Sequence, residues 1–169
     1  MTLFGSGGVG KTSLILRFVR HFFSERLTAT VGTNFMLKDL DVGGVPVQLV
    51  IWDIGGQARF ESLRQTYFKG TNGALGVFDL TKPETLEDIP GWIDSIQAVV
   101  NDPGLPVFLL GNKVDLPRAI PREQAVVRAE ELGCGYLETS AKTGESVEEA
   151  FGAVAAKCLE RAREVFGAE

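Results

Sequence analysis

The chain has 169 residues, of which 23% are charged, and a formal net charge of −5 at pH 7. This length is near the size of one domain and is sufficient to bury a core, so we expect a single domain over residues 1–169. The negative charge argues against nucleic-acid binding, and no apolar run is long enough to span a bilayer. Cys134 and Cys158 are isolated, which favours buried free thiols in a reducing compartment, and hence a cytoplasmic location, over a disulfide.

The first element is an apolar strand over Met1–Phe4, and it leads into a glycine-rich motif. The motif fits G-x-x-x-x-G-K-[ST] and reads Gly5-Ser6-Gly7-Gly8-Val9-Gly10-Lys11-Thr12. Glycines let successive N–H groups point at one set of phosphate oxygens, Lys11 can reach the β and γ oxygens, and the Thr12 hydroxyl can ligate Mg²⁺. The alternative is a glycine-rich turn without a ligand, but the full pattern arises by chance only about once in a hundred or more chains of this length.

A helix and a hairpin are predicted next. The helix covers Ser13–Phe22, because its apolar residues recur at intervals of three and four. After a polar stretch over Ser24–Gly32, two alternating runs predict strands, and the Gly43-Gly44 pair between them is typical of a two-residue hairpin. These strands are Phe35–Val42 and Val45–Trp52.

The rest of the chain alternates between helical and strand patterns. The predicted elements are a helical segment around Arg59–Phe68, a strand at Gly73–Asp79, a helix from Leu86 to Val100 that begins near Pro90, a strand at Pro106–Gly111, a helix at Arg122–Leu132 with Pro121 at its first position, and a strand at Tyr136–Thr139. A capping box at Ser146-Val147-Glu148-Glu149 opens the last helix, whose buried face comprises Val147, Phe151, Val154 and Cys158.

This alternation predicts an α/β fold of three layers, in which helices cover both faces of one sheet. The sheet has six strands and is mostly parallel, with one antiparallel edge strand from the hairpin, and about five helices accompany it. Ligands of such sheets bind beyond the carboxyl ends of the strands. Each glycine-rich or polar motif of this chain falls at such an end, which predicts one composite site.

One of these motifs is Asp53-Ile54-Gly55-Gly56-Gln57, which ends the second hairpin strand. The Asp53 carboxylate can hold Mg²⁺, the Gly56 N–H can approach a γ-phosphate, and the Gln57 amide can orient a water molecule. A simple turn after a strand would account for the glycines but not for the acid and the glutamine together.

Two later motifs point to recognition of guanine. They are Asn112-Lys113-Val114-Asp115 and Thr139-Ser140-Ala141-Lys142, and each ends a predicted strand. The Asp115 carboxylate can accept two hydrogen bonds from N1–H and the 2-amino group of guanine, a donor pair that adenine lacks. The Lys113 stem can cover one face of the base, the Ala141 N–H can bond the guanine carbonyl, and the Ser140 hydroxyl can orient Asp115.

With these four motifs in order, the chain from Leu3 to about Phe166 resembles a small GTPase of the Ras superfamily, a phosphate-loop NTPase. The resemblance implies a first switch at Ser24–Thr33, in which Thr30 closes over Mg²⁺ and the γ-phosphate, and a second switch at Gly56–Tyr67. It implies that Gln57, Lys11, Thr30 and Gly56 serve hydrolysis, and that Thr12, Thr30 and Asp53 hold Mg²⁺. The GTP or GDP contacts that it implies are Gly5, Ser6, Gly7, Gly8, Val9, Gly10, Lys11, Thr12, Ser13, Phe23, Thr30, Gly56, Asn112, Lys113, Asp115, Ser140, Ala141 and Lys142, with Phe23 edge-on to the base.

Within the superfamily the chain is most similar to the Rab branch. The segment Thr30–Phe35 resembles the Rab first switch, and Phe35, Trp52 and Tyr67 fall where Rab proteins carry an aromatic triad that contacts effectors. Core packing is an equally weighted alternative for these three aromatics. The Asp53–Gln57 motif resembles the Arf branch instead, but the chain lacks the acylated glycine and amphipathic helix that an Arf protein should have at its start.

The resemblance also implies partners and limits. It implies a monomeric switch that meets an exchange factor, a GTPase-activating protein and effectors through both switches. Leu27 occupies the position where heterotrimeric α-subunits have a built-in arginine, so hydrolysis should be slow without a partner. No C-a-a-X box ends the chain, so prenylation and peripheral membrane attachment are expected only if a tail is missing. Short ends and the lack of a lipid site would also suit an archaeal Rab-like protein. Two other functions stay open: a GTP-locked scaffold without catalysis and a phosphate-loop ATPase or kinase.

Overall fold

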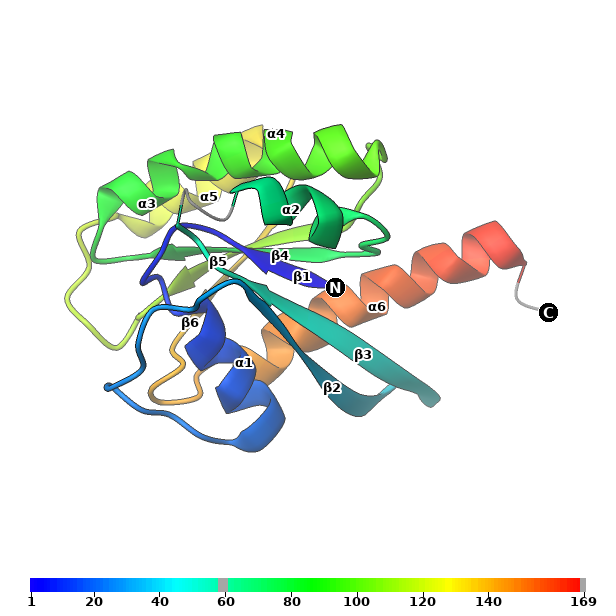
Figure 1. Ribbon diagram of the computed structural model, residues 1–169, viewed down its shortest axis with the longest axis horizontal. Coiled ribbons are helices and arrows are strands. Elements are labelled where there is room, and N and C mark those ends of the chain that lie inside the picture. The colour runs from blue at the N-terminus through cyan, green and yellow to red at the C-terminus, as the bar shows by residue number, and fades with distance from the viewer. Residues whose placement is uncertain (58–60, 168–169) are drawn as a thin grey trace.

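The computed structural model describes residues 1–57 and 61–167, and strands alternate with helices along them (Figure 1). The elements in chain order are β1 (Thr2–Phe4), α1 (Lys11–Arg20), β2 (Thr33–Val42), β3 (Val45–Ile54), α2 (Glu61–Phe68), β4 (Ala74–Asp79), α3 (Pro83–Glu87), α4 (Ile89–Val100), β5 (Val107–Asn112), α5 (Arg122–Glu131), β6 (Gly135–Thr139) and α6 (Val147–Phe166).

The strands form one six-stranded sheet in the order β2-β3-β1-β4-β5-β6. Only the pairing of β2 with β3 is antiparallel, and every other neighbouring pair is parallel. The predicted mostly parallel sheet with one antiparallel edge is therefore confirmed. Its consequence is that β1, β3, β4, β5 and β6 all end at the same edge of the sheet, where their following loops meet.

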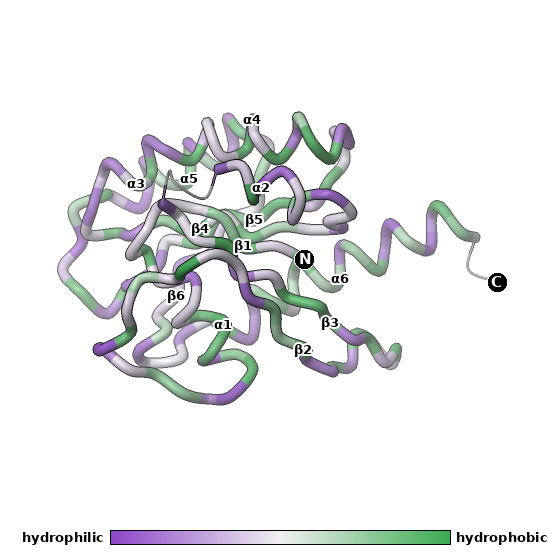
Figure 2. The backbone as a smooth tube through the Cα atoms, in the orientation of Figure 1, coloured by the Kyte–Doolittle hydropathy of each residue, from purple (hydrophilic) through white to green (hydrophobic). Residues whose placement is uncertain are grey.

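Helices cover both faces of the sheet (Figure 1). On one face α1 and α6 pack against Leu3, Leu75 and Val77, and on the other face α2, α3, α4 and α5 pack against Phe4 and Phe78. Consecutive residues such as Leu3 and Phe4 thus serve opposite cores, as the period of two along a strand requires. Figure 2 shows hydrophobic residues along the strands of the sheet and, alternating with hydrophilic ones, along α6.

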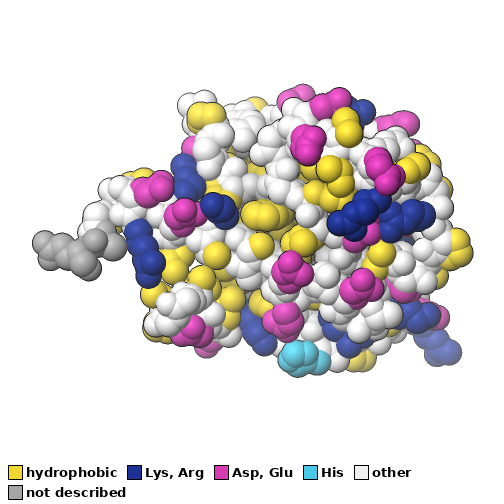
Figure 3. Space-filling view, turned by 180° about the vertical axis from the view of Figure 1, so that it is seen from behind, with side chains coloured by type: hydrophobic (Ala, Val, Ile, Leu, Met, Phe, Trp, Pro, Cys, Tyr) yellow, Lys and Arg dark blue, Asp and Glu magenta, His cyan; other side chains and the backbone are white. Residues whose placement is uncertain are grey.

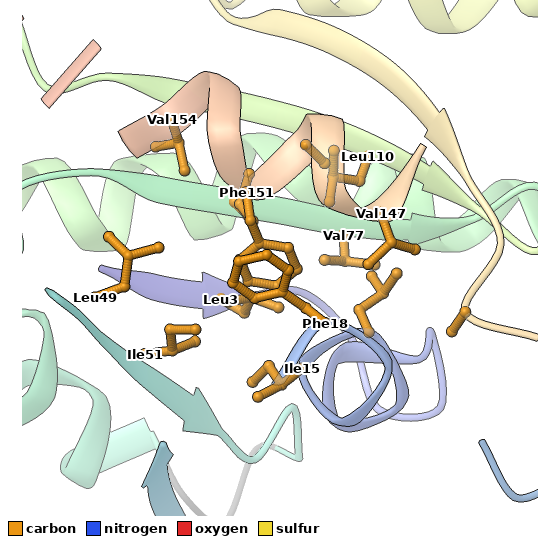
Figure 4. Packing of buried hydrophobic residues seen from close by; sticks show 14 of the residues in the cluster. Leu3, Ile15, Phe18, Leu49, Ile51, Val77, Leu110, Val147, Phe151 and Val154 are labelled. Carbon is orange, nitrogen blue, oxygen red and sulfur yellow. The ribbon is translucent and has the colours of Figure 1, made fainter. Parts of the chain in front are cut away.

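The core between the sheet and helices α1 and α6 centres on two stacked rings, one from each of these helices. Phe18 of α1 and Phe151 of α6 are fully buried, and their ring centroids lie 4.2 Å apart with an angle of 3° between the planes. Figure 4 shows both rings among Leu3, Ile51 and Val77 from the strands. This stack fixes α1, and with it the loop that precedes α1, relative to the C-terminal helix.

The hairpin prediction is confirmed in its turn residues. Gly43 and Gly44 have φ values of 59° and 83°, and the strands pair in register from Val42 with Val45. Positive φ at both central residues is the signature of a type I′ turn, whose twist matches that of the flanking strands. Side chains other than glycine would be strained at these two positions.

Three local predictions differ from the structure. The capping box is wrong: Ser146 has a left-handed φ of 54°, which differs from the extended backbone of a capping residue, and its side chain makes no capping bond. Pro121 is the residue before α5 rather than its first residue. The helical pattern from Leu86 to Val100 divides at Asp88 into α3 and α4, and Pro90 lies in the first turn of α4, as predicted.

Element boundaries shift by one or two residues, and the thiols are less buried than predicted. Helix α1 begins at Lys11, and β2 and β3 each extend two residues further from the turn of the hairpin than the sequence pattern indicates.

Cys134 and Cys158 are free but only half-buried. Arg59, at the predicted start of the helical segment now seen as α2, lies outside the described residues. None of the described helices combines the length and the apolarity needed to cross a bilayer.

Phe151→Ala should destabilise the fold by about 3–5 kcal/mol, because it removes a fully buried ring that the surrounding core cannot replace. Urea unfolding under fixed ligand conditions measures the loss. Val165→Ala on the same helix is the matched control, since Val165 is 69% exposed and its truncation should cost less than about 0.5 kcal/mol. Equal effects of the two substitutions would contradict the central role of the stacked rings.

Candidate functional site

A cavity of about 480 Å³ opens at the edge of the sheet where the parallel strands end. It is lined by fifteen of the residues singled out from the sequence: Gly7, Gly8, Gly10, Lys11, Thr12, Ser13, Phe23, Thr30, Gly56, Gln57, Asn112, Lys113, Asp115, Ala141 and Lys142. Residues 24, 25 and 27–29 of the first-switch segment also line it, as does Leu116, which sequence reasoning did not single out. The composite site that the strand ends predicted therefore exists as one cavity.

The other five predicted site residues do not line the cavity; they are Gly5, Ser6, Val9, Asp53 and Ser140. Gly5 and Ser6 accept hydrogen bonds through their carbonyl oxygens, the Val9 carbonyl is bonded by Asn112, Ser140 bonds Asp115, and Asp53 bonds Thr12. Their contacts hold cavity residues in place. In this structure they support the site rather than form its surface.

The phosphate-binding motif wraps around the side chain of Lys11. The Lys11 ammonium donates to the Gly5 carbonyl at 2.7 Å and to the Ser6 carbonyl at 2.9 Å, and the residue is only 6% exposed. Gly8 and Gly10 have φ values of 78° and 103°, which open the loop around this cation. Burial lowers the pKa of Lys11 to about 8, although nearby Asp53 opposes the shift. A buried ammonium whose bonds all go to neutral carbonyls fits a polyanionic ligand.

Three oxygen-bearing side chains meet beside this loop. The Thr12 hydroxyl lies 2.6 Å from the Thr30 hydroxyl and donates to Asp53 Oδ2 at 2.5 Å. The other Asp53 oxygen, Oδ1, is buried and has no partner among the described atoms. Burial raises the pKa of Asp53, while the bond from Thr12 and the charge of Lys11 oppose the rise. Two hydroxyls and a carboxylate with an unused oxygen fit Mg²⁺, which takes few protein ligands.

The described residues contain no cluster of three or more histidine, cysteine, aspartate or glutamate side chains able to hold a metal ion. The arrangement at Thr12, Thr30 and Asp53 is thus a partial shell. Such a shell suits a cation that takes its other ligands from phosphate oxygens and water.

Gly56 brings the second switch directly against the phosphate loop. A Cβ atom at Gly56 would come within 2.6 Å of the Gly5 carbonyl oxygen, so only glycine fits there. Gln57 follows, and its Cγ lies 3.8 Å from where a Cβ of Gly7 would stand. The Gln57 side chain therefore lies beside the phosphate loop, and Gln57 lines the cavity.

The other end of the cavity is organised by hydrogen bonds between the two late motifs. The Ser140 hydroxyl donates to Asp115 Oδ1 at 2.6 Å, so Ser140 does orient Asp115. Asn112 ties this end to the phosphate loop, because its amide donates to the Val9 carbonyl at 2.9 Å. The Ala141 N–H, expected to face a base carbonyl, points at Asn112 Oδ1 over a long 3.4 Å in this structure.

Several supporting residues were missed by sequence reasoning. Lys113 lies 2.7 Å from Asp79 Oδ2 and donates to the Gly8 carbonyl at 2.9 Å. Burial alone would raise the pKa of Asp79, but bonds from Lys113 and Thr81 outweigh it and the pKa is lowered. Asp79 ends a buried strand, so the reasoning that singled out Asp53 could also have found it.

Two further contacts link the last motif, at Ala141 and Lys142, to helix α1 and to the first-switch segment. Arg17 of α1 donates to the Ala141 carbonyl at 2.7 Å and to the Lys142 carbonyl at 2.5 Å. Lys142 in turn pairs with Glu25 at 2.7 Å. No sequence motif signals these contacts, because they join segments more than a hundred residues apart.

The three aromatics Phe35, Trp52 and Tyr67 form one cluster on the surface. The ring centroids of Phe35 and Trp52 lie 5.1 Å apart, those of Trp52 and Tyr67 5.2 Å apart, and Phe35 is 52% exposed. Phe35 and Trp52 are partners in the β2–β3 register. The rings pack on one another but are not sealed in the core, so they are available to a partner.

The model of the Ras family matches residues 1–160. The chain belongs to the Ras family. Its relatives include Ras-related protein Rab-13 of Canis lupus familiaris, which is 38% identical over 94% of this chain and 79% of its own length. RABD2a of Arabidopsis thaliana is 37% identical over 95% of this chain and 80% of its own, and Rab-30 of Homo sapiens is 38% identical over 97% and 81%. The predicted Rab branch is confirmed, and the Arf-like motif at Asp53–Gln57 is a local feature within it.

This Ras-family chain carries mixed charge on its surface. Figure 3 shows acidic and basic side chains interspersed with hydrophobic ones on the face seen from behind, with the single histidine, His21, at its rim. Such mixing provides no extended basic surface on this face, which agrees with the net charge of −5.

The buried Lys11 should make the ligand-free protein more stable as pH rises. Between pH 8 and 10.5 the folded protein has released a proton that the unfolded chain still holds, so the free energy of unfolding should increase with pH by up to about 3 kcal/mol. Lys11→Met lacks this titration and should be more stable than the parent near pH 7. Urea unfolding from pH 7.5 to 10.5 measures both, and the difference between the two curves isolates Lys11. Parallel curves would contradict the buried charge.

Proposed function

We propose that this protein is a guanine-nucleotide switch that binds GTP with Mg²⁺, hydrolyses it slowly to GDP and phosphate, and changes the order of its two switches on hydrolysis. The observation that carries the proposal is the single cavity between the phosphate loop and the Ser140–Asp115 pair. Family membership supports the same type of switch.

The base end of the cavity supports selection of guanine. Asp115 is held at one oxygen by Ser140, which leaves the carboxylate oriented for the N1–H and 2-amino donors of guanine. Adenine lacks this donor pair and would offer no hydrogen bond to the carboxylate beyond the one from Ser140, which costs affinity. Lys113, fixed by Asp79 and the Gly8 carbonyl, carries its stem along the same wall. Phe23 also lines the cavity and is proposed to contact the base edge-on.

The phosphate end supports binding of a triphosphate with a cation. Backbone N–H groups of the loop and the first turn of α1 favour anions, and Lys11 adds a positive charge that gains a partner when phosphate binds. Thr12, Thr30 and Asp53 are the residues that would hold Mg²⁺. Held there, Mg²⁺ would supply positive charge that offsets the negative charge developing on the phosphate oxygens.

Hydrolysis is proposed to depend on position and charge rather than on a strong base. The Gln57 amide orients the attacking water, the Gly56 N–H donates to the γ-phosphate, and Lys11 stabilises negative charge on the β- and γ-phosphate oxygens. Leu27 leaves no arginine at the position used in cis by heterotrimeric α-subunits. We therefore expect slow turnover that a partner accelerates by supplying an arginine.

The partner surface is proposed to include the aromatic cluster. Phe35, Trp52 and Tyr67 join the two switches, because Phe35 follows the first switch and Tyr67 ends the second. Aromatic side chains are enriched in protein interfaces and supply apolar area with little entropy cost. Effectors, an exchange factor and a GTPase-activating protein are expected to contact this region, and their contacts should depend on the nucleotide.

Asp115→Asn should weaken GTP binding by about 10²-fold or more and shift the preference towards XTP. The asparagine amide can donate to the 2-carbonyl of xanthine, where the aspartate can only accept. Fluorescence titration of both nucleotides against parent and variant measures the shift. Asp94→Asn, an exposed change on α4, is the control and should alter neither affinity. An unchanged GTP preference would remove Asp115 from the base pocket.

Gln57→Leu should bind GTP with nearly the parent affinity and hydrolyse it about 10- to 100-fold more slowly. The substitution keeps the bulk of the side chain and removes the amide that holds the water. Single-turnover phosphate release and a nucleotide titration on the same preparation separate the two effects. Parent-rate hydrolysis by the variant would exclude Gln57 as the water-positioning residue, and no release by the parent would favour a GTP-locked scaffold.

A further inference from the structure

Arg64 lies on α2 with its guanidinium stacked over the indole ring of Trp92 on α4. The guanidinium carbon is 3.8 Å from the ring centroid, a distance at which the cation–π attraction is strong. Its Nη2 donates to the Gln57 carbonyl at 3.0 Å and to the Gly56 carbonyl at 3.3 Å. One guanidinium therefore joins helix α4 to the backbone of the residue proposed to orient water.

Keeping this cation in place has an electrostatic cost. Arg64 is half-buried, and its Nε is buried without a partner among the described atoms. The positive charge of Arg64 also adds to the lowering of the pKa of Lys11, so the two cations lie close enough to repel. A leucine or methionine would fill the same space against Trp92 without this repulsion. The carbonyl bonds are what only the arginine provides.

Helix α4 supports the phosphate loop as well. Asp88, the residue before α4, accepts a hydrogen bond from the Ser6 hydroxyl at 2.7 Å. Asp88 and Trp92 are four residues apart and lie on one side of the first turn of α4. Helices α2 and α4 lie side by side in the same layer (Figure 1). The start of α4 thus contacts the phosphate loop through Ser6 and the Gln57 backbone through Arg64.

We infer that Arg64 is a positioning residue for GTP hydrolysis: clamped by Trp92, it holds the Gly56 and Gln57 carbonyls so that the Gln57 amide stays over the phosphate loop. The inference rests on the proposed function of Gln57. Glycines at 55 and 56 leave the backbone before Gln57 with more conformational freedom than other residues would. A planar donor fixed on a ring restricts that freedom without touching the substrate.

The test measures single-turnover hydrolysis and GTP affinity in Arg64→Gln and Arg64→Lys. Arg64→Gln should slow hydrolysis by roughly tenfold and leave the GTP dissociation constant within about twofold. Arg64→Lys should slow hydrolysis nearly as much as Arg64→Gln does, because an ammonium cannot stack on the ring and bond both carbonyls at once. Asp94→Asn, an exposed change on α4 outside both switches, is the control and should keep the parent rate. Parent-rate hydrolysis by both Arg64 variants would overturn the inference.

A double substitution distinguishes positioning from general support of the fold. If Arg64 acts through Gln57, Arg64→Gln should slow the parent roughly tenfold but change the Gln57→Leu protein by less than about twofold. An equal slowing in both backgrounds would overturn the inference and assign Arg64 a structural role. If Arg64→Gln does not fold, the same comparison is made with Arg64→Lys. If Gln57→Leu by itself hydrolyses GTP at the parent rate, the proposed function of Gln57 fails first, which is a separate result.

Discussion

The site depends on the close approach of three backbone segments at the carboxyl edge of the sheet. The phosphate loop follows β1, and Gly56 after β3 packs directly on the Gly5 carbonyl. Gly5 itself packs against the Val77 backbone of β4. No side chain fits between these segments, so glycine is required at both positions. Because β1 lies between β3 and β4, the parallel order of the sheet creates this contact and the rest of the site is built around it.

Charge at this edge is arranged for a ligand rather than for the stability of the protein alone. Lys11 is a buried ammonium bonded to neutral carbonyls, Asp53 retains an unpartnered buried oxygen, and Arg64 is held near Lys11. Each of these features costs free energy in the absence of phosphate and a cation. The core of stacked rings and buried aliphatic side chains on both faces of the sheet offsets that cost. Binding of phosphate and a cation would give these groups oppositely charged partners and so remove much of that cost.

The two helical layers support opposite parts of the cavity. On one face, Arg17 of α1 bonds the carbonyls of Ala141 and Lys142, and the Phe18–Phe151 stack anchors α1. On the other face, α4 contacts Ser6 and reaches the Gln57 backbone through Arg64. A change in either helical layer can therefore alter the site without touching the ligand.

The sequence by itself determined the fold class and the four motifs of the site. Glycine spacing, apolar periodicity and the residues at strand ends are local properties, so they could be recognised without coordinates. The parallel order of the sheet then predicted that Lys11, Gln57 and Asp115 face one cavity. Only the tertiary structure decided the supporting contacts of Arg17, Asp79 and Arg64, and the surface position of the aromatic cluster. These contacts join distant segments, and nothing in the local pattern of an arginine or a ring specifies its partner. The failed capping box at Ser146 has the same cause, because a left-handed backbone set by the preceding loop overrode the local signal.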